Sequence, residues 1–508
     1  MSISFVHVMV YEGLIDRLLE ADKKIGFVSI PSFVPFQKES QQNALFINVD
    51  SYLSTGRLKS ESPTLLARNI YQRITEHEML QLYWQFRRRN PEPIQLGELY
   101  SYLLPVIGFC LDLLESTGTS SLVYGGIPHS FYDYALLLTA RYMSMPLTIF
   151  QEFPWTPYGC IQYSEYLVPL MQERHFLNSK LPALNQRYLD VAESLARNVV
   201  RSGKAFIPDF LHPDTALTRD GNYWLRSYLE NLPPGKPLKT GSLSMNAGFL
   251  CSGSDSSIAC LKQMAFNLDD TPLASVRAVS LYRHLLHLEQ FQISPADHSG
   301  SDCSIFILPL PCEPECSLNP MCSEFVTTEE IVKFCIDAIP DDSLLLLKEH
   351  PGMLGVEGSK ENPYLDPIET YRFPLHELVM KHANLGWLPV APSLEEAEFL
   401  RSIPILYAVG TIGVEAYLKA LNIIPIATSL LNLVGFTASS SIDRIIPESI
   451  PAEGLDYEDI RSRSFALYTH ILPFSPVGKF NGFFPYSSES DYISGRRLAN
   501  KIIEDLSL

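Results

Sequence analysis

Short apolar runs alternate with segments of helical periodicity in two separate stretches of the chain. In the first stretch the pattern predicts strands over 3–10, 25–30, 121–124 and 146–151, and helices over 14–23 and 132–142. In the second it predicts strands over 303–308, 343–347 and 403–409, and helices over 328–338 and 414–421. Strands that alternate with helices form βαβ units, in which the strands pair in parallel. The chain is therefore predicted to hold two α/β domains.

The region between these stretches, 205–300, has a less regular pattern. Its helical segment 281–291 carries His284 and His287, which we expect to be surface or packing residues rather than ligands. Residues 491–508 are typical of a closing amphipathic helix. These features divide the chain into four segments, 1–215, 216–300, 301–465 and 466–508. In open parallel sheets ligands bind beyond the carboxyl ends of the strands, so we expect the functional residues to follow strands.

The charge balance limits the partners of the chain. Its 508 residues include 39 Lys and Arg against 57 Asp and Glu, which gives a net charge of −18. Nucleic acids and broad anionic membrane surfaces attract basic proteins, so neither is expected as the main partner. A local basic pocket for a small anion stays open. The 46% of hydrophobic and 19% of charged residues also exclude extensive disorder of the highly charged type.

Targeting and cysteine patterns favour the cytoplasm. The N-terminal segment has no basic region and is predicted to be a strand, not a signal peptide. The longest apolar stretch, 102–114, contains a proline and an aspartate and is predicted to be too short to span a bilayer. The nine cysteines are scattered and form no CxxC pair. We therefore expect reduced, structural thiols and no metal centre.

Polar residues follow the apolar run 344–347 abruptly, in the sequence KEHP. Lys348 and His350 share one face by the strand period of two, and Glu349 takes the other. Pro351 restricts His350 to an extended conformation, which orients the imidazole. A cation and a hydrogen-bond donor after a strand suit a phosphate group. The same residues also suit an ordinary surface loop, and their spacing alone does not separate the two interpretations.

A GTIG turn joins the last predicted strand to the helix that follows it. Gly410 and Gly413 would let the backbone approach a ligand, and the first helical turn offers free N–H groups and a positive dipole end. Thr411 is the natural N-cap. The third helical position is then Val414, so Glu415 lies one residue too late for a capping box. Its carboxylate could instead accept hydrogen bonds from ligand hydroxyls, such as those of a ribose.

A proline-rich loop, LPLPCEPEC, follows the strand 303–308. Its prolines favour a rigid, extended conformation that would line a cleft. Glu313 and Glu315 are either ligand contacts or part of a solvated face. The pattern alone favours the solvated face.

The segment 120–152 predicts a strand, a Gly-Gly turn, a helix and a second strand. His129 and Asp133 are four residues apart and share one helical face if the helix begins by His129. Either side chain could take a proton from an acceptor hydroxyl. Ser130 and Asp133 also fit a capping box, which would account for Asp133 but not for His129. Glu152, at the end of the second strand, is a weaker candidate.

Three motifs in order resemble one family: Pro314–Glu315, KEHP at 348–351 and GTxGxEA at 410–416. The set is similar to the capsule polysaccharide biosynthesis family, which holds bacterial capsule Kdo-transferase proteins and related surface-glycan glycosyltransferases. The likeness covers mainly 300–430, with a PHxxxD patch near 121–152. It implies a GT-B-like α/β fold with two Rossmann-like domains. Their parallel sheets would face an interdomain cleft, and a C-terminal helix would cross back to the first domain.

The resemblance also implies that the two domains bind different substrates. The donor would bind to the domain over 301–465 and the acceptor to the domain over 1–215. The donor residues would be Glu315, Lys348, His350, Gly410, Thr411, Gly413 and Glu415. By carry-over His350 would contact the donor phosphate, the glycine turn would cradle it, and Glu415 would face the ribose. One departure from the family is that Cys312 and Glu313 precede the PE pair, where related sequences often place an amide side chain. The role of this loop therefore stays open.

The sequence thus predicts a cytoplasmic glycosyltransferase of bacterial surface or capsular polysaccharide synthesis. Its partners would be a nucleotide-sugar donor, with a CMP-linked sugar among the options, and a glycan or glycolipid acceptor. His129 or Asp133 would act as the base, or Asp133 as a nucleophile if the reaction retains configuration. No cofactor and no metal are expected, and peripheral contact with inner-membrane assembly machinery is a further option.

Three alternatives stay open at this point. One is a phosphotransferase of the CDP-polyol type, and another is a sugar-nucleotide epimerase, both on the same two-domain plan. The third is a non-catalytic partner in capsule assembly.

Overall fold

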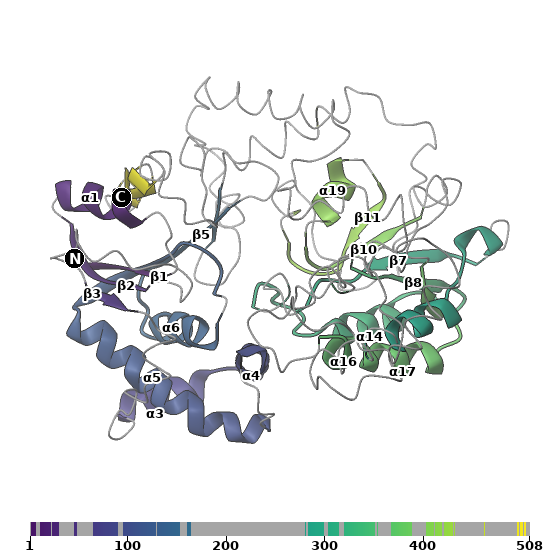
Figure 1. Cartoon of the computed structure of the whole chain (residues 1–508), viewed down its shortest axis with the longest axis horizontal. Helices are drawn as coiled ribbons and strands as arrows, with labels where there is room; N and C mark the ends of the chain where they lie inside the picture. The colour runs from purple at the N-terminus through teal and green to yellow at the C-terminus, as the bar shows by residue number, and fades with distance from the viewer. Residues whose placement is uncertain are drawn as a thin grey trace, which may run out of the picture.

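The computed structural model contains two β-sheets, each with helices on both of its faces (Figure 1). It describes residues 2–6, 11–21, 23–29, 45–47, 64–89, 95–128, 130–152, 160–163, 280, 283–298, 303–313, 318, 320–350, 353, 367–388, 403–410, 412–418, 421–429, 431, 462, 495–496, 498–500 and 502–503. The two α/β units expected from the sequence pattern are therefore confirmed.

The first sheet has the strand order β3-β2-β1-β4-β5-β6. The strands are β1 Ser2–Val6, β2 Lys24–Ser29, β3 Leu45–Ile47, β4 Thr119–Tyr124, β5 Leu147–Glu152 and β6 Cys160–Tyr163. All neighbours pair in parallel except β6, which runs antiparallel to β5 at the edge. When the five parallel strands are numbered by their order in the chain, they lie side by side in the sheet in the order 3-2-1-4-5, as in Rossmann-type sheets. Ligands of such sheets bind where the order reverses, which is here between β1 and β4.

The second sheet repeats this arrangement with the order β11-β10-β7-β8-β9. The strands are β7 Ile305–Pro309, β8 Leu344–Lys348, β9 Leu385–Trp387, β10 Ile405–Tyr407 and β11 Ile423–Pro425. All pairs are parallel. Numbered from one by their order in the chain, these strands again lie in the order 3-2-1-4-5. The strand order reverses between β7 and β10. The four leucines of β8 are buried, as expected for a central strand that is covered on both faces.

Helices cover both faces of the first sheet (Figure 1). They are α1 Tyr11–Glu20, α3 Leu65–Arg73, α4 Glu76–Arg89, η1 Leu96–Glu98, α5 Leu99–Ser116 and α6 Phe131–Tyr142. The sequence pattern did not predict α3 and α4. The pattern also predicts an apolar segment over only 102–114. In the structure η1 and α5 together form one longer helical stretch, Leu96–Ser116, which by length and composition could cross a membrane. Half of its most apolar window is buried inside the protein.

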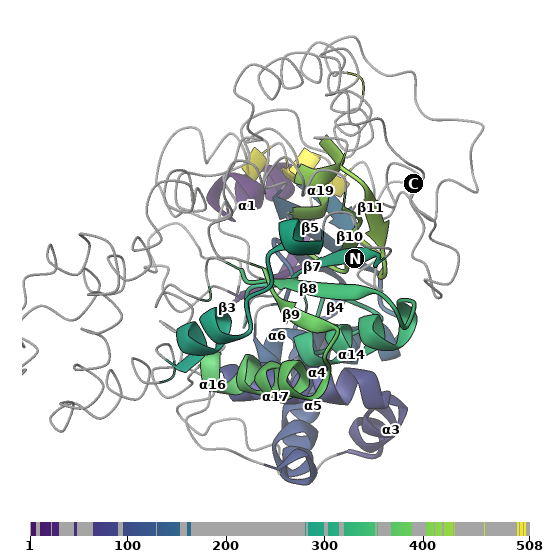
Figure 2. The same ribbon diagram turned by 90° about the vertical axis from the view of Figure 1, so that its right-hand side faces the viewer.

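In the second unit α19, Ile412–Leu418, lies on one side of the sheet and three helices lie on the other (Figure 2). These three are α14 Thr328–Ala338, α16 Pro367–Tyr371 and α17 Phe373–Lys381. Residues 283–290 form a further helix, which is followed by η2, Pro295–His298. The bounds of α14 agree with the prediction, because Thr327 and Glu330 form a capping box that defines its start.

The end of the chain returns to the first unit (Figure 1). Leu498, Ala499 and Ile502 pack in one core cluster with Phe5 of β1 and Leu14 of α1. A bidentate ion pair joins Arg496 to Glu20 at 2.6 and 2.7 Å, and Arg17 donates to the Asn500 amide oxygen at 2.7 Å. The closing segment therefore covers the α1 face of the first sheet.

Helix α4 connects the two units. The Gln81 amide nitrogen donates to the carbonyl oxygens of Pro320 and Cys322 at 3.3 and 3.1 Å. Trp84 packs against Tyr371, with ring centroids 5.4 Å apart. The contact thus places a helix of the first unit against the segments that flank β8 in the second.

Candidate functional site

The carboxyl ends of β7, β8 and β10 meet at one edge of the second sheet, because parallel strands end on the same side. KEHP begins at this edge with Lys348, the last residue of β8. Lys348 and His350 are partly exposed, whereas Glu349 between them is buried. This alternation follows the strand period of two. Glu349 therefore faces the protein interior, and its partners there are the main feature of the site.

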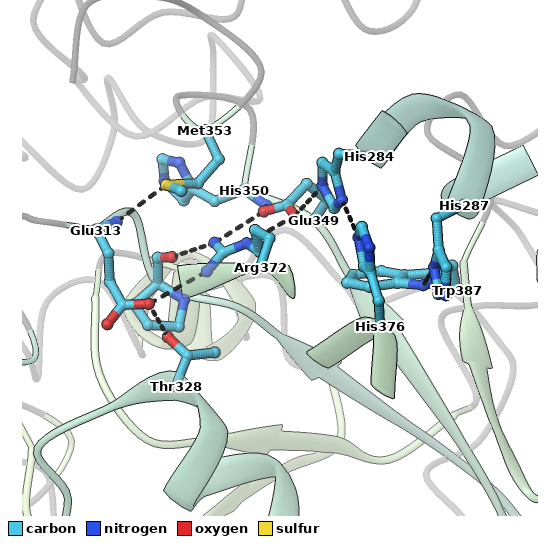
Figure 3. Close-up of polar contacts among 11 residues, drawn as sticks. His284, His287, Glu313, Thr328, Glu349, His350, Met353, Arg372, His376 and Trp387 are labelled. Atoms are coloured by element: carbon cyan, nitrogen blue, oxygen red, sulfur yellow. Dashed lines mark hydrogen bonds and ion pairs between the residues drawn. The ribbon is translucent and has the colours of Figure 1, made fainter. Parts of the chain in front are cut away.

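Glu349 forms a bidentate ion pair with Arg372, the residue between α16 and α17 (Figure 3). The guanidinium Nε and Nη2 donate to the two carboxylate oxygens at 2.8 and 2.9 Å. The nearby guanidinium charge, reinforced by a hydrogen bond from His284, outweighs burial and lowers the pKa of Glu349. A carboxylate in this setting stays ionised at neutral pH.

Glu313, in the loop after β7, belongs to the same cluster. Its carboxylate accepts hydrogen bonds from the Thr328 hydroxyl and from Arg372 Nη1, the latter at 3.2 Å. Burial raises the pKa of Glu313 to about 7, because Arg372 and Thr328 compensate only part of the desolvation. The expectation that Glu313 belongs to a solvated face is wrong. The loop turns this carboxylate inward, where buried Arg372 meets it.

A chain of aromatic rings extends from Glu349 into the protein (Figure 3). His284 Nε2 lies 2.8 Å from the Glu349 carboxylate, and its Nδ1 lies 2.8 Å from His376 Nε2. The ring of His376 stacks on His287 with centroids 3.9 Å apart, and the Trp387 indole N–H donates to His287 Nδ1 at 3.0 Å. His284 and His287 are both buried, so they are packing residues rather than surface residues.

Burial lowers the pKa values of His287, His350 and His376. It lowers the pKa of His287 to about 4 and that of His376 to about 3, with nearby histidines adding to the effect. The pKa of His350 falls to about 4, first through burial and then through the charge of Lys348. The imidazole of His350 is therefore neutral at neutral pH. It can donate or accept a hydrogen bond toward a ligand, while Lys348 supplies a positive charge.

The local structure accounts for both glycines of the GTIG turn. Gly410 has a φ of 96°, a conformation that residues with a side chain rarely adopt. A β-carbon at Gly413 would overlap the ring of Tyr407, whose hydroxyl donates to the Gly410 carbonyl at 2.6 Å. Packing on Tyr407 therefore explains Gly413 without a ligand. Thr411, like Glu315, lies outside the described residues, and of Glu415 only its backbone position in α19 is described.

The first-unit candidates follow β4, at the point where the strand order of that sheet reverses. His129 lies outside the described residues, as does the side chain of Glu152. Ser130 is the N-cap of α6, and its side chain accepts from the Asp133 N–H at 3.2 Å. The Ser130 hydroxyl also donates to the Asp133 carboxylate, which is 2% exposed. The structure thus gives Asp133 a capping partner, and its catalytic role stays a prediction.

Sequence reasoning missed the most connected residue of the site, Arg372. Its two carboxylate partners lie 23 and 59 residues away along the chain. No local pattern marks an arginine that will be buried by such distant partners. Two features of the sequence indicate part of this cluster, the proline-rich loop around Glu313 and the KEHP motif. Each places a carboxylate after one of two adjacent strands.

Comparisons with known proteins add no assignment. A search of protein families finds no match to the chain, and no curated protein is significantly similar to it. Within the described residues no group of three or more His, Cys, Asp and Glu side chains is arranged to hold a metal ion. Five cysteines of that part of the chain, Cys110, Cys303, Cys312, Cys322 and Cys335, are free thiols.

Proposed function

We propose that the protein is a glycosyltransferase of GT-B architecture that acts in the cytoplasm in bacterial surface-polysaccharide synthesis. The observation that carries the proposal is the pair of sheets that share the order 3-2-1-4-5. Each sheet has its predicted site residues after the strands at or beside the point of reversal. Sheets of this kind bind nucleotides there, and the likeness to the capsule family supports a nucleotide sugar as the ligand.

In this proposal the second unit binds the donor. Lys348 offsets the charge that develops on the departing phosphate, and neutral His350 donates a hydrogen bond to the same group. Glu415 and the glycine turn would contact the rest of the nucleotide. The first unit would bind a glycan or glycolipid acceptor, with His129 or Asp133 as the group that takes the hydroxyl proton.

Binding and product analysis test the proposal in two steps. Isothermal titration of the full chain with CMP, UDP, GDP and CDP should show binding of at least one nucleotide. Incubation with the matching nucleotide sugars and candidate acceptors should then yield a new glycosidic bond. A phosphodiester product would indicate a phosphotransferase instead, and turnover without an acceptor would indicate an epimerase. Binding to none of the four nucleotides would contradict the donor site.

The donor residues can be tested singly. His350→Ala and Glu415→Ala are each expected to lower the rate of sugar transfer by about two orders of magnitude, the typical effect of one group that stabilises developing charge. Glu329→Ala is the matched control, since Glu329 lies at a half-exposed position of α14 and pairs with Lys333 of the next turn. Full activity in both donor-site variants would refute the proposed site.

A further inference from the structure

Arg372 is fully buried between the loops that follow β7 and β8 (Figure 3). Besides its two bonds to Glu349 after β8, it donates from Nη1 to Glu313 at 3.2 Å and from Nη2 to the Pro311 carbonyl at 2.8 Å, both after β7. One guanidinium group therefore holds two loops that come from adjacent parallel strands. A planar fork with five donors can do this, whereas the point charge of a lysine cannot reach both loops in the same way.

The link extends to the backbone of KEHP. The second oxygen of the Glu349 carboxylate, Oε1, accepts the His350 backbone N–H at 2.7 Å as well as Arg372 Nη2. The orientation of the His350 peptide thus depends on the position of the guanidinium group. On the other loop the Glu313 N–H contacts the Met353 sulfur at 3.2 Å, so the β7 loop also touches the second residue after KEHP.

Stability alone does not account for this cluster. Burying one arginine and two carboxylates carries a large desolvation cost, and buried ion pairs are often replaceable by apolar residues without loss of stability. The raised pKa of Glu313 is a sign of that cost. The cluster lies beneath the edge where ligands of such sheets bind. Its charged groups are better explained by the orientation that they give to the loops above them.

We propose that Arg372 is a positioning residue of the donor site. Its guanidinium group holds the loops after β7 and β8 at a fixed separation and orients His350 toward the phosphate of a nucleotide. The effect on the nucleotide rests on the proposed function. The restraint on the two loops does not.

The test compares Arg372→Lys with wild type in the full chain. Hydrogen–deuterium exchange should rise about tenfold to a hundredfold in both loops, over 310–313 and 349–353, since each loop loses a hydrogen bond to a charged group. Affinity for whichever of CMP, UDP, GDP and CDP the wild type binds should fall at least about tenfold. The unfolding midpoint should fall only moderately, because the charge is kept while hydrogen bonds to two buried carboxylates are lost.

Two further variants keep the test decisive. Arg141→Lys changes a largely buried, ion-paired arginine of the first unit and should leave exchange in both loops as in wild type. If Arg372→Lys fails to fold, the double variant Arg372→Met/Glu349→Gln removes the buried Arg372–Glu349 ion pair and should show the same loss of protection.

Each outcome has a distinct meaning. Unchanged exchange in either loop would overturn the restraint that we assign to Arg372. Faster exchange with unchanged nucleotide affinity would leave Arg372 a purely structural residue and overturn its positioning role. A wild type that binds none of the four nucleotides would refute the proposed function, while the exchange data would still decide the restraint.

Discussion

Replacing Glu313 by glutamine should make the protein more stable, and increasingly so as pH rises. The pKa of this carboxyl group is raised from its ordinary value of 4.5 to about 7, mainly by burial. Glutamine has nearly the same shape, and its amide oxygen can still accept from Thr328 and Arg372. The substitution therefore removes the ionisation and keeps the hydrogen bonds that the oxygen accepts.

The sign and size follow from the two pKa values. Between pH 4.5 and 7 the folded protein keeps the Glu313 proton that the unfolded chain has released, so protonation favours the folded state. This stabilisation is complete below about pH 4.5 and is lost as pH rises through about 7. A pKa change from 4.5 to about 7 corresponds to about 3 kcal/mol in total, of which about 2–3 kcal/mol falls between pH 5 and pH 8.

The assay is equilibrium unfolding of wild type and Glu313→Gln in urea at pH 5, 6, 7 and 8. Tryptophan fluorescence can be followed, since Trp387 is buried in the same unit. The difference in free energy of unfolding, variant minus wild type, should rise by about 2–3 kcal/mol from pH 5 to pH 8. Glu329→Gln, at a half-exposed position of α14, corrects for the general loss of one acidic residue. A difference that is flat with pH would refute the reasoning.

Two other substitutions test the packing described above. Gly413→Ala should destabilise the second unit by about 1–3 kcal/mol, because its β-carbon would overlap the Tyr407 ring; Gly97→Ala, where a β-carbon meets no atom within 4 Å, should change the unfolding midpoint little. Ser130→Ala should cost about 0.5–2 kcal/mol through loss of the α6 N-cap, and an unchanged urea midpoint would contradict the cap.

Much of the fold follows from local patterns in the sequence. The alternation of apolar runs and helical periods is enough to predict two α/β units, because each strand and helix depends on residues within a few positions of one another. Helix α14 is the clearest case, since its capping box and apolar spacing lie within the same short segment. The alternating exposure of Lys348, Glu349 and His350 likewise follows from the pleat of one strand.

Local patterns were weaker where an element's place depends on other parts of the chain. The pattern did not predict α3 and α4, and α4 makes its contacts with Pro320, Cys322 and Tyr371 in the other unit. The strand orders also could not be predicted, because hydrophobic periodicity marks a strand but does not name its neighbours. The need for glycine at position 413 also depends on the nearby Tyr407 ring, a contact that no local pattern reveals.

By itself the sequence determined that strands end in polar, glycine-rich and proline-rich loops where a ligand can bind. Only the tertiary structure decided which of those polar groups face inward. Glu313 and Glu349 come together because the adjacent parallel strands β7 and β8 end at one edge of the sheet, and Arg372 meets both from the junction of α16 and α17. A charged side chain can be buried only where an opposite charge meets it. The pairing of these distant charges is a property of the folded chain, and no local segment of the sequence contains it.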